Sequence, residues 1–341
     1  MAWLVLLALA LVFFSVRFLR GDTLVYLDSH VLPAPEGVAS EAHNSILDRL
    51  SEFAGSGAKL RGKARVYAIR EYMDALCDGR EFESAFRPVQ EGQLRGEWVL
   101  APGADPRRRL LYIHGGAFFA GSPRSHRTIT DRLSRLTGCA VFSLDYRLMP
   151  EHRRLDGILD CRSAYRWLLT NGPEGPEKLE YFLMAGDSAG GNLTLVTLAW
   201  ARDEGLRPVD AAIAFSPATD ASLTSPSLRD NLKTDPMLGP AFGWMSKIPT
   251  PLLWWGSWAM ARIRPAEPLV SPLRGDLSGL PPVLVQASEA EMLYDDARRF
   301  VRKAELAGSP ALLQSWPHMV HVWQIFTPEL PEAEDAYANI A

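Results

Sequence analysis

The stretch from Tyr181 to Asn192 constrains the fold of this chain more than any other. Its first residues, Tyr181 to Ala185, form an apolar run that predicts a buried strand, and a helical pattern follows from Leu193 to Ala201. Between them lies Gly-Asp-Ser-Ala-Gly, with Ser188 at its centre. Strand, tight turn and helix in this order are typical of a nucleophilic serine, although an ordinary glycine-rich turn can have the same sequence. We therefore expect Ser188 at the carboxyl end of a strand, where the helix N-terminus favours developing negative charge.

The rest of the chain alternates between strand-like and helix-like segments. This alternation predicts an α/β fold with a mostly parallel sheet and helices on both of its faces. Further strands are expected at 93–100, 110–113, 140–144, 211–215, 282–286 and 312–316, a basic turn at 103–109, and helices at 45–53, 67–77, 159–169 and 294–307.

Composition narrows the class of protein. The chain has 341 residues, of which 47% are hydrophobic and 22% charged, so a sizeable core is expected. Its net charge of −4 argues against a nucleic-acid partner, which requires a basic face. The cysteines Cys77, Cys139 and Cys161 are odd in number and lack metal-ligand spacing, so we expect buried free thiols.

Residues 1–20 form an apolar N-terminal segment that we separate from the domain at 21–341. A helix over Ala2 to Val16 would be roughly 23 Å long, which is short of the ~30 Å hydrocarbon core of a bilayer. Arg17 and Arg20 follow it. We favour membrane association through residues 2–20 with the domain in the cytoplasm, by the positive-inside rule. A secretory signal of an exported protein, or a buried helix of a soluble cytoplasmic one, stays open.

The alternation stops between residues 222 and 268, where proline and tryptophan are frequent. This segment is too long and too apolar for a plain loop, so we expect helical cap elements at about 222–268 and 21–62. The tryptophans either pack the cap onto the body, contact a substrate or touch a membrane.

Polar and glycine residues follow the predicted strands directly. His114-Gly-Gly-Ala-Phe118 follows one strand, and its adjacent glycines leave backbone N–H groups free to stabilise an oxyanion. We interpret His114 as a side chain that braces this loop. Asp145, Arg147 and Glu151 follow another strand and are predicted to form an ion-pair cluster.

Acidic and histidine residues follow the last two strands. Glu289 and Glu291 come after the strand at 282–286, and His318 and His321 come after the strand at 312–316. The chain order is therefore serine, acid, histidine, as expected of an α/β-hydrolase triad.

Together these motifs resemble the α/β-hydrolases of the hormone-sensitive-lipase-like group, the bacterial carboxylesterases. The matching pieces run in order over roughly residues 105 to 325: His114 to Ala117, Asp145 to His152, Gly186 to Asn192, Asp295-Asp296 and His321. The resemblance implies the α/β-hydrolase fold and hydrolysis of carboxylic esters with no metal and no organic cofactor.

The resemblance also implies roles for single residues. Ser188 is expected to be the nucleophile and His321 the base, with His318 as a weaker rival. The expected oxyanion donors are the N–H groups of Gly115, Gly116 and Ala189, with His114 and Asp187 in support. The family usually places Asp where this chain has Glu291, so Glu291 is the expected acid and Glu289 and Asp295 are the alternatives.

The predicted function is therefore a serine carboxylesterase acting on short- to medium-chain esters. The partner is a small-molecule or lipid ester, and a homodimer is possible. A long-chain lipase at a membrane surface and an amidase or deacetylase stay open, and a non-catalytic binding protein is the least favoured alternative.

Overall fold

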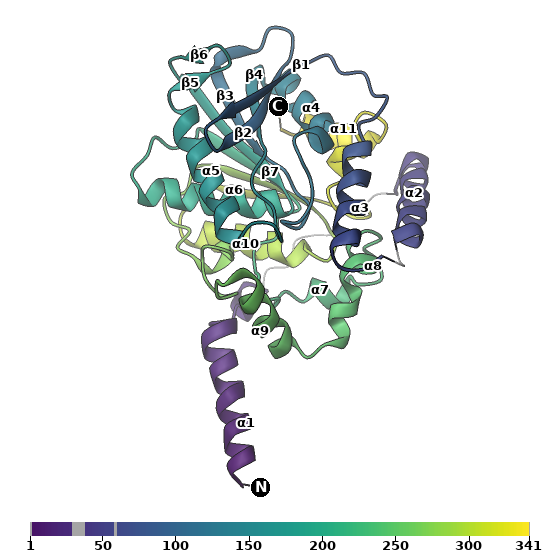
Figure 1. Ribbon diagram of the computed structural model, residues 1–341, viewed down its shortest axis with the longest axis vertical. Coiled ribbons are helices and arrows are strands. Elements are labelled where there is room, and N and C mark those ends of the chain that lie inside the picture. The colour runs from purple at the N-terminus through teal and green to yellow at the C-terminus, as the bar shows by residue number, and fades with distance from the viewer. Residues whose placement is uncertain (1, 29–37, 58–59, 341) are drawn as a thin grey trace.

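The computed structural model describes residues 2–28, 38–57 and 60–340 (Figure 1). Its main sheet has eight strands in the order β1-β2-β4-β3-β7-β8-β9-β10. Strand β2 is antiparallel to both of its neighbours, and all pairs from β4 to β10 are parallel. The strands are β1 (Ala85–Glu91), β2 (Leu94–Leu100), β3 (Asp105–Ile113), β4 (Cys139–Leu144), β7 (Tyr181–Asp187), β8 (Ala211–Phe215), β9 (Val283–Ser288) and β10 (Ala311–Trp316), with a separate hairpin of β5 (Asn171–Gly172) and β6 (Gly175–Pro176). The predicted fold class is confirmed.

Helices cover both faces of this sheet. The α-helices are α1 (Ala2–Phe14), α2 (Glu41–Gly57), α3 (Gly62–Ala75), α4 (Arg127–Thr137), α5 (Arg154–Leu168), α6 (Ala189–Asp203), α7 (Ser227–Asp230), α8 (Leu238–Phe242), α9 (Thr250–Ala261), α10 (Tyr294–Leu306) and α11 (Pro331–Ala338). A π-helix, η1 (Ser15–Arg20), and five 3₁₀-helices complete them: η2 (Val25–Leu27), η3 (Arg124–His126), η4 (Gly243–Lys247), η5 (Pro272–Arg274) and η6 (Trp323–Phe326).

The hydrophobic core is divided by the sheet into two clusters. One cluster packs side chains of α5, α6 and α10 against the sheet, including Tyr165, Leu198 and Phe300. The other packs α4 and α11 against the opposite face, including Ile129 and Tyr337. Apolar residues at helical spacing on each helix are buried in this way, which is why the alternation of strands and helices could be predicted from the sequence.

One local prediction is wrong, and one strand was missed. The predicted basic turn at 103–109 is mostly strand, because β3 already begins at Asp105. Arg109 is accommodated in this strand because its buried guanidinium donates to the carbonyl oxygens of Leu168 and Glu177, both at 2.8 Å. Strand β1, at the edge of the sheet, was not predicted, since its side chains are mostly exposed and give no apolar pattern.

The predicted ion-pair cluster of Asp145, Arg147 and Glu151 is also wrong. Arg147 pairs with Asp160 of α5 at 2.7 Å, Glu151 pairs with Arg70 of α3, and Asp145 lies 3.9 Å from Arg95. The three residues are neighbours in sequence, but their side chains leave the loop in different directions. Each therefore fastens the loop to a different element.

The segment 222–268 is helical as expected, and Figure 1 shows α7, α8 and α9 gathered at one end of the molecule. The predicted cap segment at 21–62 contains η2 and α2, while 29–37 and 58–59 lie outside the described residues. That these segments cover the active site stays a prediction.

Helix α1 projects from the body beyond α9 (Figure 1). Its residues confirm the helix expected over Ala2 to Val16, with η1 continuing it to Arg20. Among the helices that the structure describes, none combines the length and the apolar character needed to cross a membrane.

Candidate active site

Ser188 lies on a sharp turn between β7 and α6. Its backbone has a φ of 52°, a conformation rarely adopted by residues other than glycine. The end of the neighbouring strand β3 approaches the start of α6 closely. A Cβ on Gly190 would lie 1.9 Å from the carbonyl oxygen of Ile113 in that strand. Glycine is therefore required there by packing, and the serine is held at the carboxyl edge of the sheet as predicted.

Ser188, His321 and Glu291 are brought together at this edge. The Nε2 atom of His321 lies 2.9 Å from Ser188 Oγ, and its Nδ1 atom forms a short hydrogen bond with Glu291 Oε2. Glu291 is fully buried and His321 is 3% exposed. This is the geometry of a nucleophile, a base and an orienting acid.

The pKa of His321 is shifted by the groups around its imidazole ring. Burial disfavours the charged form, but the adjacent Glu291 carboxylate and its hydrogen bond outweigh this, so the pKa of His321 lies above its ordinary value of 6.5. A raised pKa strengthens His321 as a proton acceptor and stabilises the imidazolium that forms during attack.

Glu291 fits the acid position despite its extra methylene group. Its side chain turns back so that Oε1 accepts from the backbone N–H of Ser288 at 2.8 Å while Oε2 reaches His321. Asn231 holds the loop from outside by donating to the carbonyl oxygens of Glu289 and Glu291 at 2.7 and 2.9 Å. Asn231 was missed by the sequence analysis, and no motif marks it, since it acts across a large sequence separation.

The alternative acid and base residues have other contacts. Glu289 accepts from Ser315 at 3.0 Å, and Asp295 accepts from the backbone N–H of Ser227 at 2.8 Å. His318 is exposed. Within the described chain, Glu291 and His321 are therefore the acid and histidine that reach Ser188.

The expected oxyanion donors need one correction. The N–H of Gly115 already donates to Asp187 Oδ1 at 2.9 Å, so this group is not available to a substrate. The N–H groups of Gly116 and Ala117 have no hydrogen-bond acceptor among the described residues, and Ala189 is the first residue of α6. The prediction for Gly115 is wrong, while Gly116 and Ala189 stay candidates and Ala117 joins them.

A buried polar network holds the loop that carries these donors. Asp187 also accepts from Tyr112 at 2.6 Å and lies 3.4 Å from the Nε2 atom of His126. Asp187 therefore ties the serine turn to the oxyanion loop, which agrees with its expected supporting role. Neither Tyr112 nor His126 was selected from the sequence, because nothing in their local pattern indicates this contact.

His114 braces the loop, as interpreted from the sequence. Its Nδ1 atom lies 2.8 Å from the carbonyl oxygen of Gly115, and its ring stacks on Tyr146 with centroids 4.4 Å apart. Burial, with a smaller contribution from His126, lowers the pKa of His114 to about 3. The ring is therefore neutral, and it does not contact Ser188.

The cysteines and possible metal ligands of the described chain were also compared with the sequence expectations. Cys77, Cys139 and Cys161 are free and buried, as predicted. In the part of the chain that the structure describes, no three His, Cys, Asp or Glu side chains are grouped so that they could hold a metal ion.

Comparison with known proteins shows the family to which this chain belongs. A model of the alpha/beta hydrolase fold matches residues 110–325. The chain belongs to the α/β-hydrolase family. This α/β-hydrolase is 38% identical over 249 residues to an acetyl-hydrolase of Streptomyces hygroscopicus, covering 73% of this chain and 78% of that protein. It is 36% identical over 279 residues to an esterase of Acinetobacter venetianus, covering 80% of this chain and 87% of that one.

Solved structures place this α/β-hydrolase more narrowly. A crystal structure of an esterase from the bacterial hormone-sensitive lipase family superposes with a TM-score of 0.74 at 34% identity. The match covers 89% of this chain and 97% of that one. The resemblance stated from the sequence motifs is thus confirmed at the level of family and fold.

Proposed function

We propose that this α/β-hydrolase is a serine carboxylesterase that cleaves short- to medium-chain esters through an acyl-enzyme. The observation that carries the proposal is the 2.9 Å contact between Ser188 Oγ and His321 Nε2, with Glu291 on the other ring nitrogen. The esterases and the acetyl-hydrolase to which the chain is similar support the same reaction class.

The reaction follows from the site. His321 Nε2 takes the proton of Ser188 as Oγ attacks the ester carbonyl carbon, and the carbonyl π bond opens to an oxyanion. The oxyanion collapses, the carbon–oxygen bond to the alcohol breaks, and His321 returns the proton to the leaving alcohol. Water then attacks the acyl-enzyme by the same steps and releases the carboxylic acid.

The oxyanion is held by backbone N–H groups of Gly116, Ala117 and Ala189. The first two belong to the loop braced by His114, and the third lies at the N-terminus of α6, where the helix dipole favours negative charge. Each such donor typically contributes about 3–4 kcal/mol to transition-state stabilisation.

A substrate series tests this function. We expect turnover of p-nitrophenyl esters to peak at short or medium acyl chains and Ser188→Ala to lower kcat by about 10⁵-fold. The matched control is Ser246→Ala, which removes an exposed serine hydroxyl of η4 and should leave kcat unchanged. Wild-type turnover by Ser188→Ala would refute the mechanism, and faster cleavage of the matching anilides would favour an amidase.

We also infer that residues 2–20 associate with a membrane. Helix α1 has no charged residue, and its large apolar side chains, including Trp3, Leu9 and Phe13, are exposed. Arg17 and Arg20 follow directly, which by the positive-inside rule favours a catalytic domain on the cytoplasmic side. A turnover maximum at long acyl chains would favour a lipase acting at this surface.

A further inference from the structure

Helix α9 has an unusual outer face. The exposed positions Leu252, Gly256, Ala259 and Met260 follow the spacing of a single helix face, and none of them is polar. Leu252 is 61% exposed and Met260 is 57% exposed. A surface helix of a globular domain normally turns polar residues outward, whereas this face exposes apolar side chains to solvent.

Helix α1 is apolar in every direction. Its exposed residues Trp3, Leu9, Leu11, Val12 and Phe13 are spread around the helix, which advances by about 100° per residue. Such a helix is normally surrounded on all sides by apolar material. A protein partner or a second copy of the chain would cover one face, whereas lipid surrounds the whole circumference.

The two helices are joined where α1 meets the body. The indole Nε1 of Trp255 donates to Ser15 Oγ at 2.9 Å, and Trp255 stacks on Phe14 with ring centroids 5.9 Å apart. Phe18 meets Trp258 edge-on at 6.3 Å. Figure 1 shows α9 at the base of α1. This aromatic cluster fixes the outer face of α9 beside the projecting helix.

Basic side chains lie at the same junction. Arg17 and Arg262 are exposed and Arg20 is half-buried, and none of the three has a carboxylate partner among the described residues. Arg264 is the neighbour that does form an ion pair, with Glu267, and its guanidinium lies 4.9 Å from the ring of Phe18. Free guanidinium groups beside exposed apolar and aromatic residues are the chemistry that binds lipid phosphates at a membrane surface.

We propose that α1 and the outer face of α9 form one membrane-docking surface for an anionic phospholipid bilayer. The apolar side chains enter the hydrocarbon, and Trp255 and Trp258 lie at the headgroup level. Arg17, Arg20 and Arg262 bind phosphates. This inference rests on the proposed function for its substrate: esters dissolved in the bilayer are delivered to Ser188.

The docking surface is connected to the nucleophile through the loop after β8. The N–H of Ala218 donates to the carbonyl oxygen of Ser188 at 3.3 Å, and Trp254 of α9 donates to the carbonyl oxygen of Ser222 at 2.6 Å. A short loop therefore joins the base of α9 to the serine turn.

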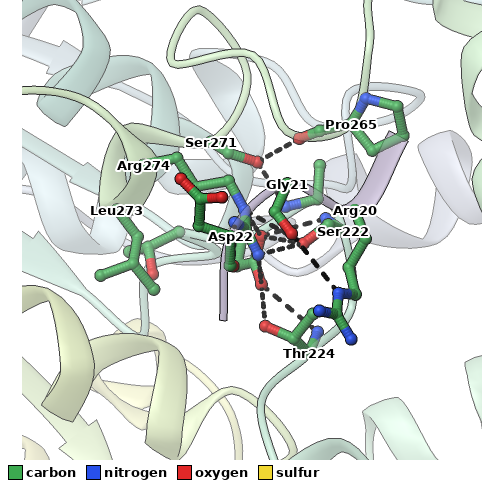
Figure 2. Close-up of polar contacts among 12 residues, drawn as sticks. Arg20, Gly21, Asp22, Ser222, Thr224, Pro265, Ser271, Leu273 and Arg274 are labelled. Atoms are coloured by element: carbon green, nitrogen blue, oxygen red, sulfur yellow. Dashed lines mark hydrogen bonds and ion pairs between the residues drawn. The ribbon is translucent and has the colours of Figure 1, made fainter. Parts of the chain in front are cut away.

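Arg274 connects the N-terminal segment to the same loop (Figure 2). It pairs with Asp220 at 2.9 Å and donates to the carbonyl oxygen of Asp22, also at 2.9 Å. Gly21 turns the chain toward this contact with a φ of 74°, and a Cβ there would lie 3.0 Å from the guanidinium of Arg274. The docking surface is thereby held in a fixed position relative to the active site.

Vesicle flotation of the full chain tests the α9 part of the surface. We expect wild type to float with phosphatidylglycerol–phosphatidylcholine vesicles and the double variant Leu252→Glu/Met260→Glu to lose at least about tenfold in affinity, because two charges would enter hydrocarbon. The matched control is Leu306→Glu, which changes a side chain of the same type, 58% exposed, on α10. Unchanged binding by the double variant, or an equal loss in Leu306→Glu, would overturn the proposal.

The arginines are tested by charge and salt. Replacing Arg17 or Arg262 by Gln should weaken binding to anionic vesicles by about fivefold each and reduce its salt dependence. Binding to pure phosphatidylcholine vesicles should not change. Equal affinity of wild type for neutral and anionic vesicles would overturn the role of the arginines.

Activity separates this proposal from the proposed function. With p-nitrophenyl acetate in solution, Leu252→Glu/Met260→Glu should match wild type, whereas its turnover of a medium-chain p-nitrophenyl ester held in vesicles should fall with the loss of binding. Vesicle binding by a protein that hydrolyses no ester would refute the esterase function and leave the docking surface standing. Turnover of the vesicle-held ester at the wild-type rate by the double variant would overturn bilayer delivery.

Discussion

Two regions of this molecule reverse the usual distribution of side chains, in opposite ways. At the carboxyl edge of the sheet, polar groups such as Asp187, Glu291 and His321 are almost completely buried. At the α1–α9 end, large apolar side chains such as Phe13 and Leu252 are exposed. Buried polar groups and exposed apolar patches are the informative exceptions to the rule of apolar interiors.

The difference between the regions lies in where each finds its partners. The buried carboxylates at the sheet edge have partners within the chain: Glu291 binds His321, and Asp187 binds Tyr112 and Gly115. The exposed apolar groups of α1 and α9 have no such partner in the described structure, and we propose that a bilayer supplies one. On this proposal the first region performs the chemistry with preorganised groups, while the second determines where that chemistry takes place.

Of the changes that test this comparison, the largest effect on activity is expected when the charge of Glu291 is removed. Glu291→Gln keeps the shape of the side chain but cannot hold the imidazole as a proton acceptor or offset its positive charge, so kcat should fall by about 10⁴-fold. Steady-state hydrolysis of p-nitrophenyl acetate measures this. Vesicle binding should not change, and a loss of binding in this variant would mean that the two regions are coupled.

Arg274 connects the N-terminal segment to the loop after β8, and its loss should destabilise the protein. Arg274→Met leaves Asp220, which is fully buried, without its counter-charge, and breaking such a pair costs about 3–5 kcal/mol. Urea denaturation in mild detergent measures the change. Pairing the substitution with Asp220→Asn should recover part of the loss. An unchanged denaturation midpoint would show that the Arg274–Asp220 pair does not contribute to the stability of the fold.

The pH profile sharpens the description of the buried region. Attack by Ser188 needs neutral His321, and the Glu291 carboxylate raises the pKa of His321 above 6.5 despite burial. As the pH falls through this raised pKa, kcat/KM should drop about tenfold per pH unit, starting at a higher pH than for an ordinary imidazole. In Glu291→Gln the residual activity should fall at lower pH. An acid limb below 6.5 in wild type would contradict this.

The smallest expected effect concerns the junction of α1 and α9. Trp255→Phe keeps an aromatic ring but removes the donor to Ser15, so we expect a loss of about 1 kcal/mol in the stability of the junction. Protection from proteolysis near η1 measures this. Esterase activity on soluble substrate should remain at the wild-type level, and a fall in it would place the junction in the catalytic machinery.

The fold class and the order of Ser188, Glu291 and His321 along the chain could be predicted from the amino-acid sequence. Strand β8 was predicted with its observed bounds, and β7 and α6 were found on either side of Ser188, because buried strands and helices impose apolar patterns on local sequence. Ser188 was identified for the same reason, since the sharp turn requires glycines that are visible as a motif. The family comparison confirmed what this order implied.

Contacts between segments that are distant in sequence became known only from the folded chain. The family resemblance favoured Glu291 and left Glu289 and Asp295 as alternatives, and the contacts of the three side chains in the folded chain show that Glu291 is the one that reaches His321. The sequence also could not show that the N–H of Gly115 is occupied by Asp187, far along the chain. Local sequence fixes backbone conformation through short-range sterics and burial, whereas hydrogen-bond partners are chosen by packing between distant segments.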